Sequence, residues 1–282
     1  MLSRIKSDFH SHTSFSGDCE TPMEEQIKKA IELGLEHFCI TDHLDLDYPE
    51  HYGYFDLDVG PYTDQVLLMK EKYKDQINIY LGIEFGLVPE EGIVKRYEDL
   101  ANKYPFDFIL GSIHTIGWKD PYFPDYWEGK TRNQGIVEYF DSILENIRAY
   151  DNYDSLGHLD YIIRYANMPE NPKRNKELIF DNFAYREYGE VLDEILKHLM
   201  KNDKSLEVNT AGYKYGLGAP NPGYSVLKRY KELGGKLITI GSDGHKPEHL
   251  AYDFDKVYDL LKAVGYDSYV IYKNRLQQFI QL

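Results

Sequence analysis

Short apolar runs alternate along the chain with longer segments in which apolar residues recur every three or four positions. The short runs have the length of buried strands, and the longer segments have the periodicity of amphipathic helices. Seven strands are predicted in this way, at residues 5–9, 37–41, 77–83, 106–110, 154–157, 205–208 and 236–240. Strands that alternate with helices are typical of a parallel α/β domain.

The predicted helices lie between these strands or follow the last of them. The first is indicated by the capping-box pattern Thr21-Pro22-Met23-Glu24, with proline at the first helical position, and it stops at Gly34. Further helices are predicted at residues 64–73, 91–103, 133–150, 176–200, 225–233 and 247–264. No repeat, low-complexity tract or long linker marks a boundary, so we expect residues 1–282 to form a single domain.

The amino-acid composition argues against several classes of protein. The net charge is −15, from 32 Lys and Arg against 47 Asp and Glu, which argues against a long nucleic acid as partner. No apolar run approaches the roughly 18 residues of a membrane span, so we expect no membrane partner. The start of the chain lacks a secretory signal, and the two cysteines, Cys19 and Cys39, form no CxxC pair. We therefore expect a cytoplasmic enzyme.

Three loops, at residues 48–62, 117–131 and 211–224, are long and rich in glycine, proline and aromatic residues. Loops of this length inside a compact domain often carry function. Acidic loop residues such as Asp45 and Asp47 are interpreted as solvated surface.

Six of the seven predicted strands end in residues that can bind a metal ion. These residues are His10, His12, Asp42, His43, Glu84, His114, His158, Asp160, Asp243 and His245. The carboxyl ends of parallel strands lie together, so we expect these side chains to converge on one site. Imidazole and carboxylate ligands without thiolate favour Zn, Mn or Fe. Four other histidines lack this strand-end context and are interpreted as structural: His37, His51, His198 and His249.

The motifs around these residues resemble the PHP (polymerase and histidinol phosphatase) family. They are Asp8-Phe9-His10-Ser11-His12-Thr13 with Asp18, Thr41-Asp42-His43, Gly82-Ile83-Glu84, Ser112-Ile113-His114, Gly157-His158 and Ser242-Asp243-Gly244-His245. The resemblance runs in order from residue 8 to residue 245. Segments 8–19, 157–164 and 207–212 look like the histidinol-phosphatase branch of the family.

This resemblance implies a distorted (β/α)7 TIM-like barrel with three divalent metal ions. Carried over by motif, the ligand sets are His10, His12, Glu84 and Asp243 for one ion, Asp18, His43 and His245 for the second, and Glu84, His114 and His158 for the third. Asp18 stands where some members of the family have histidine. The implied reaction is hydrolysis of L-histidinol phosphate to L-histidinol and phosphate by attack of a metal-bridging hydroxide.

Further roles are expected near this centre. The leaving alkoxide needs a proton, which Asp243 or His245 would supply. Arg164 and Lys214 are expected to hold phosphate oxygens, although the family branch often has arginine at position 214, and lysine lacks the bidentate fork of arginine. Asp160 is expected to orient a neighbouring ligand or to meet a cationic group of the substrate.

Several alternative functions remain open on the sequence alone. A PHP-type protein-tyrosine phosphatase or a small-nucleotide phosphoesterase would keep the fold and change the substrate. A non-catalytic metal-binding scaffold is disfavoured by the intact ligand set. Barrels of the amidohydrolase type also begin with an HxH pair, but they typically have eight strands and a single aspartate after the last one. The terminal Asp243-Gly244-His245 and the Thr41-Asp42-His43 motif favour the PHP family.

Overall fold

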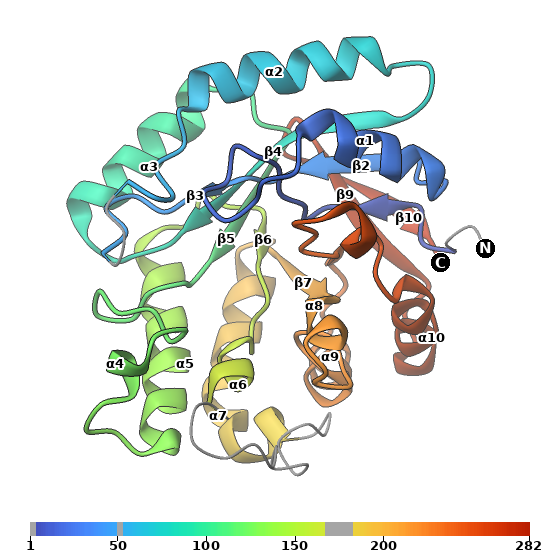
Figure 1. Ribbon diagram of the computed structural model, residues 1–282. Helices are drawn as coiled ribbons and strands as arrows, with labels where there is room; N and C mark the ends of the chain where they lie inside the picture. Colours follow the sequence, from blue (N-terminus) through green and yellow to red (C-terminus); the bar gives the residue numbers. More distant parts are fainter. Residues whose placement is uncertain (1–3, 50–52, 167–182) are drawn as a thin grey trace.

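The computed structural model describes residues 4–49, 53–166 and 183–282. Its main sheet is parallel, with the strand order β1-β2-β4-β5-β6-β7-β8 (Figure 1). These strands are β1 (Ser7–Asp8), β2 (His37–Ile40), β4 (Asn78–Gly86), β5 (Phe108–Ser112), β6 (Ser155–Leu156), β7 (Ser205–Asn209) and β8 (Ile238–Gly241). Each overlaps one of the seven predicted strands, although the ends of β4 and β5 lie two to three residues beyond the predicted ones. The two-residue strand β3 (His43–Leu44) pairs with β4 and was not predicted.

The first and last strands of this sheet meet, so the sheet is nearly closed into a barrel. The Phe9 amide donates to the Ile240 carbonyl at 2.9 Å, and the Asp243 amide donates to the His10 carbonyl at 2.8 Å. Ser11 forms a parallel bridge with Gly244 just beyond these contacts. The expected distorted seven-stranded α/β barrel is confirmed.

The barrel interior is filled by aromatic and aliphatic side chains. The rings of Phe9 and Phe108 lie 5.4 Å apart, and the rings of Phe108 and Tyr272 lie 5.3 Å apart. All three residues are buried, as are the inward-facing residues of the central strands. Polar side chains gather instead at the carboxyl ends of the strands, as in other parallel barrels.

The long helices lie on the outside of the barrel (Figure 1). They are α1 (Met23–Glu32), α2 (Val59–Lys72), α3 (Glu91–Lys103), α5 (Arg132–Ala149), α7 (Phe183–Lys201), α9 (Tyr224–Glu232) and α10 (Phe254–Val264). Short helices α4 (Pro124–Trp127), α6 (Ile162–Tyr165) and α8 (Ala211–Lys214) and the 3-10 helix η2 (Pro247–His249) follow the strands β5 to β8. The predicted helices match the long ones within two residues at most ends, but α2 begins five residues early. Residues 176–182 of the predicted helix 176–200 lie outside the described residues.

The capping box predicted at the start of α1 is wrong. Pro22 is the N-cap residue, and no side chain caps the helix. The Thr21 hydroxyl donates instead to the carbonyl of His245 at 2.9 Å. This threonine therefore ties the start of the first helix to the last motif of the chain, a partner that local sequence does not reveal.

The single helix predicted at residues 247–264 is also wrong, because the chain breaks between η2 and α10. Ala251 and Asp253 have positive φ angles of 52° and 55°, which interrupt a right-handed helix. The Ala251 amide donates to Asp8 Oδ2 at 3.0 Å, so the break joins this segment to the first strand.

A C-terminal antiparallel hairpin, β9 (Ser268–Lys273) and β10 (Leu276–Gln281), was not predicted. Its turn residues Asn274 and Arg275 both have positive φ, as a tight hairpin turn requires. The Asn274 amide donates to Asp107 Oδ1 at 3.0 Å, and Asp107 lies just before β5. The hairpin therefore covers the amino ends of the strands, opposite the polar end of the barrel.

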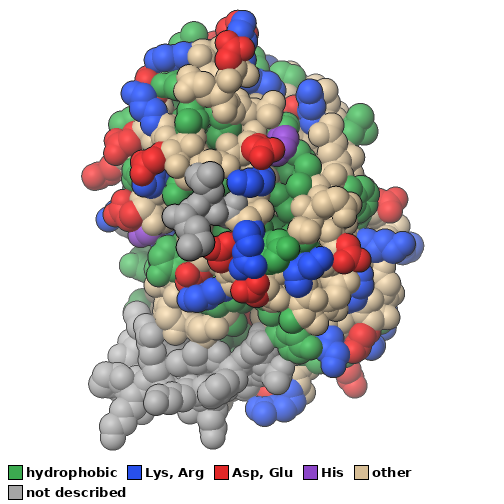
Figure 2. All heavy atoms as spheres, turned by 90° about the vertical axis from the view of Figure 1, so that its right-hand side faces the viewer, with side chains coloured by type: hydrophobic (Ala, Val, Ile, Leu, Met, Phe, Trp, Pro, Cys, Tyr) green, Lys and Arg blue, Asp and Glu red, His purple; other side chains and the backbone are tan. Residues whose placement is uncertain are grey.

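The surface is mixed in charge. On the face beside α10, the lysine and arginine side chains of the described residues alternate with aspartate and glutamate rather than forming one basic patch (Figure 2). Within the described ranges, no helix is both long enough and apolar enough to cross a membrane.

Candidate metal centre and active site

The nine predicted metal ligands converge at the carboxyl-terminal end of the barrel. They come from the ends of β1, β4, β5, β6 and β8, from β3, and from the loop after β1. Most are buried, while Asp18, Asp243 and His245 are partly exposed toward a cavity. Their convergence follows from the parallel topology, which brings all these strand ends to one side.

Glu84 lies at the centre of the cluster and is fully buried. Its Oε2 is 3.1 Å from His10 Nε2 and 3.0 Å from His43 Nδ1. Its Oε1 is 3.2 Å from His158 Nε2 and 3.4 Å from His114 Nε2. Each carboxylate oxygen thus faces a different pair of imidazoles, which suits a group that bridges two cations.

Asp243 and Asp18 complete the cluster on the cavity side. Asp243 Oδ1 lies 3.4 Å from His12 Nε2 and 3.4 Å from His245 Nδ1. Asp18 Oδ2 lies 2.9 Å from His245 Nε2 and 3.8 Å from His43 Nε2. His245 therefore stands between the two carboxylates.

Among the described residues, three groups of donor atoms lie close enough to hold a metal ion, with the atoms of each group within 4.8 Å of one another. They are His12, His43 and His245, then His10, His12 and Asp243, and then His43, Glu84 and His114. The groups share members, so the donors form one continuous cluster. Asp18 and His158 extend it at either end through their contacts with His245 and Glu84.

The donor set fits bound cations. His10 Nε2 and His12 Nε2 lie only 3.0 Å apart, and at most one proton can lie between two such nitrogens. Nδ1 of His158 is buried and has no hydrogen-bond partner among the described residues. Imidazole nitrogens and carboxylate oxygens whose lone pairs point toward a common volume are the arrangement that Zn²⁺ and related ions require.

The electrostatic interactions within the cluster also favour bound cations. Burial lowers the pKa of His10, but the carboxylates of Glu84 and Glu207 outweigh it and raise that pKa well above its ordinary value. Burial also lowers the pKa of His43, yet Glu84 and Asp18 raise it to about 9. The carboxylates therefore hold positive charge in this volume, as protons or as metal ions.

A second layer of carboxylates orients the imidazoles. Glu207, in β7, has Oε1 at 2.6 Å from His10 Nδ1, and its Oε2 accepts from the His158 amide at 2.7 Å. Asp45 Oδ1 lies 2.6 Å from His114 Nδ1. A metal-bound histidine typically donates its second ring N–H to such a carboxylate. Asp45 is only 6% exposed, so its interpretation as solvated surface is wrong.

The sequence analysis missed these supporting residues, although one signal was available. Glu207 is a charged residue in the middle of the otherwise uncharged and fully buried strand β7. Buried carboxylates are nearly always paired, so this position was a candidate. Asp42, within the quoted Thr41-Asp42-His43 motif, accepts from Ser16 Oγ at 2.8 Å, and that hydroxyl lies 3.1 Å from His12 Nδ1.

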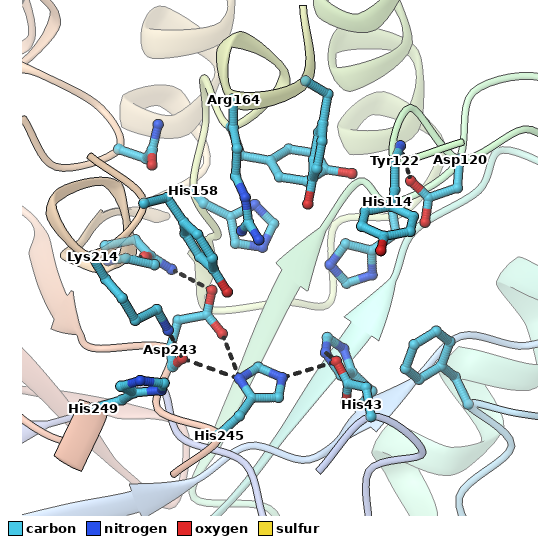
Figure 3. A pocket seen from close by; sticks show the side chains of 18 of the residues that line it. His43, His114, Asp120, Tyr122, His158, Arg164, Lys214, Asp243, His245 and His249 are labelled. Atoms are coloured by element: carbon cyan, nitrogen blue, oxygen red, sulfur yellow. Dashed lines mark hydrogen bonds and ion pairs between the residues drawn. The ribbon is translucent and has the colours of Figure 1, made fainter. Parts of the chain in front are cut away.

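A cavity of about 890 Å³ opens in front of the cluster (Figure 3). The three loops predicted to be functional contribute to its wall, through residues such as Phe55, Tyr122 and Tyr215. His249 also lines the cavity, whereas it was interpreted as structural. His37, in β2, instead contacts Tyr80 in the neighbouring strand β4, with 2.8 Å between His37 Nδ1 and the hydroxyl. His51 lies outside the described residues.

The three predicted substrate-binding residues lie around this cavity. Arg164, on α6, lines it and has its guanidinium carbon 3.0 Å from the centre of the Tyr215 ring. Lys214, at the end of α8, also lines it and donates to the Asp243 carbonyl at 3.1 Å. Asp160 is buried and accepts from Asn221 Nδ2 at 2.6 Å, and Asn221 lines the cavity.

The sequence has relatives that match over nearly its whole length. A family model described as PHP domain matches residues 8–211. The histidinol-phosphatase of Lactococcus lactis is 32% identical over 264 residues, which cover 93% of this chain and 92% of that protein. The probable histidinol-phosphatase of Clostridium acetobutylicum is 30% identical, over 96% of this chain and 98% of that protein.

Solved structures agree with these matches. A crystal structure of the Lactococcus lactis histidinol phosphate phosphatase, in complex with Zn, L-histidinol and phosphate, has a TM-score of 0.84 and 28% identity. The match covers 97% of this chain and 98% of that one. The putative histidinol phosphatase of Listeria monocytogenes has a TM-score of 0.75 at 22% identity, which supports the fold.

Proposed function

The chain belongs to the PHP domain family, and from this premise we propose that it is a metal-dependent phosphatase that hydrolyses L-histidinol phosphate to L-histidinol and phosphate. The observation that carries the proposal is the convergence of imidazoles and carboxylates around Glu84 at the mouth of the barrel. The relative from Lactococcus lactis, crystallised with Zn, L-histidinol and phosphate, supports the choice of substrate. Phosphotyrosine peptides and small nucleotides, the alternative substrates, are not favoured by these relatives.

We propose that the cluster holds three divalent ions, with Zn as the first choice and Mn or Fe as alternatives. The proposed ligands are His10, His12, Glu84 and Asp243 for one ion, Asp18, His43 and His245 for another, and Glu84, His114 and His158 for the third. Bound there, such ions would polarise phosphate oxygens and lower the pKa of a water molecule from about 15.7 toward 7. Glu207 and Asp45 would keep the imidazoles in the orientation that this requires.

Arg164 and Lys214 are proposed to hold the phosphate oxygens that face away from the metal ions. Both line the cavity, and Lys214 Nζ lies beside the Asp243 backbone at the edge of the cluster. The Arg164 guanidinium lies over the Tyr215 ring, and its forked N–H groups suit two oxygens of one phosphate. Two positive side chains match the charge of a phosphate monoester dianion.

The leaving alkoxide is proposed to take its proton from His245 or Asp243. The two lie side by side, with 3.4 Å between His245 Nδ1 and Asp243 Oδ1, and both line the cavity where the leaving group would emerge. A general acid must reach the proton acceptor at hydrogen-bond distance, which this position allows.

Substrate profiling tests the proposed function. The zinc-loaded protein is assayed for phosphate release from L-histidinol phosphate, a phosphotyrosine peptide and p-nitrophenyl phosphate. We expect kcat/KM for L-histidinol phosphate to exceed the other two by about a hundredfold, since binding energy from the leaving group stabilises the transition state. Equal or higher kcat/KM for another ester would refute the assignment of the substrate.

The phosphate-binding roles are tested with Arg164→Ala and Lys214→Ala. Each should lower kcat/KM on all three esters by about ten- to a hundredfold, because a hydrogen bond to a charged group contributes about 1.5–3 kcal/mol. Lys228→Ala is the matched control, as Lys228 lies on α9, is 54% exposed and pairs with Glu232. If Arg164→Ala and Lys214→Ala both show the kinetics of wild type, neither side chain binds the phosphate.

A further inference from the structure

The cavity has two chemically different sides. Lys214 lies on one side of the cavity, and Asp120 and Tyr122 lie on the other, beside the proposed ligand His114 (Figure 3). Among the described residues that line the cavity, Asp120 is the only carboxylate apart from the proposed ligands Asp18 and Asp243. Asp120 is not among the residues proposed above to hold the metal ions or the phosphate.

Asp120 is held in one orientation by neutral donors. The Tyr48 hydroxyl donates to Oδ2 at 2.6 Å, and the Tyr122 amide donates to Oδ1 at 2.7 Å. Within the described ranges, no lysine or arginine lies within ion-pair distance of Asp120. Burial raises the pKa of Asp120, and these two hydrogen bonds and the charge of His114 only partly oppose the rise.

Aromatic rings surround this carboxylate. The Tyr48 ring packs edge-on against Phe55, with centroids 4.8 Å apart, and the Tyr122 ring packs against Tyr165 at 5.7 Å. Tyr48, Phe55, Tyr122 and Tyr165 all line the cavity. A carboxylate set among aromatic rings is a favourable place for an organic cation, which gains an ion pair and the attraction of the ring faces.

We propose that Asp120 is a specificity residue that pairs with the ammonium group on the leaving-group side of the substrate, so that the enzyme prefers phosphate monoesters of amino alcohols. The proposal rests on the proposed function. If the phosphate is fixed at the metal cluster, the rest of the ester must extend across the cavity, where Asp120 offers a carboxylate with no lysine or arginine partner among the described residues. A cation there recovers the cost of burying that charge, whereas an uncharged leaving group does not.

A purely structural role for Asp120 is the competing explanation. Its contact with the Tyr122 amide two residues on is an Asx turn, which aspartate and asparagine form equally well. Asp120→Asn keeps that acceptor and places an amide nitrogen opposite the Tyr48 hydroxyl, which can then act as acceptor. The variant therefore removes the charge and retains the turn.

The test compares esters with and without the amine. Wild type and Asp120→Asn are assayed on L-histidinol phosphate and on its amine-free analogue 3-(imidazol-4-yl)propyl phosphate. We expect the variant to lose about ten- to a hundredfold in kcat/KM on L-histidinol phosphate, mainly through KM, with less than about a twofold change on the analogue. Inhibition by L-histidinol should weaken to a similar extent.

Asp125→Asn is the matched control, because Asp125 lies on α4, pairs with Lys119 and does not line the cavity. It should behave as wild type on both esters. Equal losses of Asp120→Asn on both esters would show a structural role, and no loss on either would show that the charge is not used. Both results overturn the proposal.

A second pair of substrates separates this proposal from the proposed function. If wild type does not act on L-histidinol phosphate, 2-aminoethyl phosphate is compared with ethyl phosphate. A wild-type preference for the amine that Asp120→Asn abolishes would support the role of Asp120 with a different natural substrate. Absence of that preference would overturn it. If no ester is hydrolysed, the binding of L-histidinol and of its amine-free analogue 3-(imidazol-4-yl)propan-1-ol is measured by calorimetric titration. Tighter binding of L-histidinol by wild type but not by Asp120→Asn would support the proposal, and equal binding of the two alcohols by wild type would overturn it.

Discussion

At the scale of single residues, the site depends on carboxylates that touch imidazoles rather than the substrate. Glu207 uses both oxygens, one toward the His10 ring and one toward the His158 backbone amide, so it sets the position of two proposed ligands at once. Glu207 is buried, so neither contact is exchanged with solvent. We therefore expect this residue to control metal binding although it is not itself a proposed ligand.

Glu207→Gln tests this expectation. Glutamine has one acceptor oxygen, so either the His10 N–H or the His158 amide would face an amide N–H group. We expect metal affinity and kcat/KM to fall by about ten- to a hundredfold, with the fold retained. Metal content by mass spectrometry and phosphate release by steady-state kinetics are the measurements. Glu232→Gln, on the exposed face of α9, is the control. Wild-type metal content in Glu207→Gln would contradict the account.

Individual residues also show which parts of the site could be predicted from the sequence. His10, Glu84 and Asp243 were predictable because each follows or ends a strand, and parallel topology then brings strand ends together. Asp45 was misjudged because its burial depends on the loop that folds over it, and its contact with His114 joins residues 69 positions apart. Pairings of this kind are set by tertiary packing, which no local pattern encodes.

At the scale of elements, the C-terminal hairpin closes the end of the barrel opposite the site. Arg275, in its turn, forms an ion pair with Asp154, and its Nη2 donates to the Asn152 carbonyl at 2.9 Å. Asp154 also accepts from the Ile109 amide at 2.8 Å and is 7% exposed. The hairpin thus fixes the segments that lead into β5 and β6.

Arg275→Ala should therefore destabilise the fold without changing the chemistry. Removing the arginine leaves a buried carboxylate without its cation, which costs about 3 kcal/mol of unfolding free energy. Chemical denaturation measures the loss, and kcat/KM per folded molecule should stay as in wild type. Arg186→Ala is the control, because Arg186 is exposed and, within the part of the chain that the structure describes, pairs only with its neighbour Glu187. A large fall in kcat with an unchanged free energy of unfolding would contradict the conclusion that the hairpin end of the barrel contributes to stability and not to catalysis.

The elements predicted best were those with strong periodicity and clear ends. Helix α3 was predicted at its observed residues, and α5 within one residue at each end. The break between η2 and α10 was missed, since it depends on Ala251 and Asp253 adopting positive φ, which neither residue favours. A contact with Asp8, far away in sequence, holds Ala251 there.

At the scale of the whole molecule, the barrel gathers negative charge at one end and uses it to hold cations. The chain has a net charge of −15, and its cluster raises the pKa of His10, His43 and His114. Without metal these imidazoles bind protons, and metal ions must displace them. That residues 1–282 form a single domain remains a prediction.

Zinc binding should therefore depend on pH in a defined direction. The pKa of His43 is about 9 in the folded protein, so this histidine stabilises the metal-free fold below its ordinary pKa of about 6.5 and loses that contribution as the pH rises toward 9. Zinc needs neutral imidazole, so we expect the rise in Tm on adding zinc to be larger at about pH 8.5 than at about pH 6. Differential scanning fluorimetry measures Tm with and without zinc at each pH.

His37→Gln is the control for this prediction, because His37 lies outside the cluster and contacts Tyr80. The variant should show the same pH dependence as wild type. A zinc-induced rise in Tm that is equal at the two pH values would mean that protons do not compete with metal at the cluster.

The most direct test of the central claim is phosphate release from L-histidinol phosphate by one zinc-loaded sample, measured before chelation, after chelation and after zinc is restored. The account predicts that kcat falls to the background rate on chelation and returns with zinc, because the clustered side chains offer ligands for a metal and no covalent nucleophile is assigned to the reaction. A kcat that chelation leaves unchanged, in protein shown to be free of metal, would contradict it.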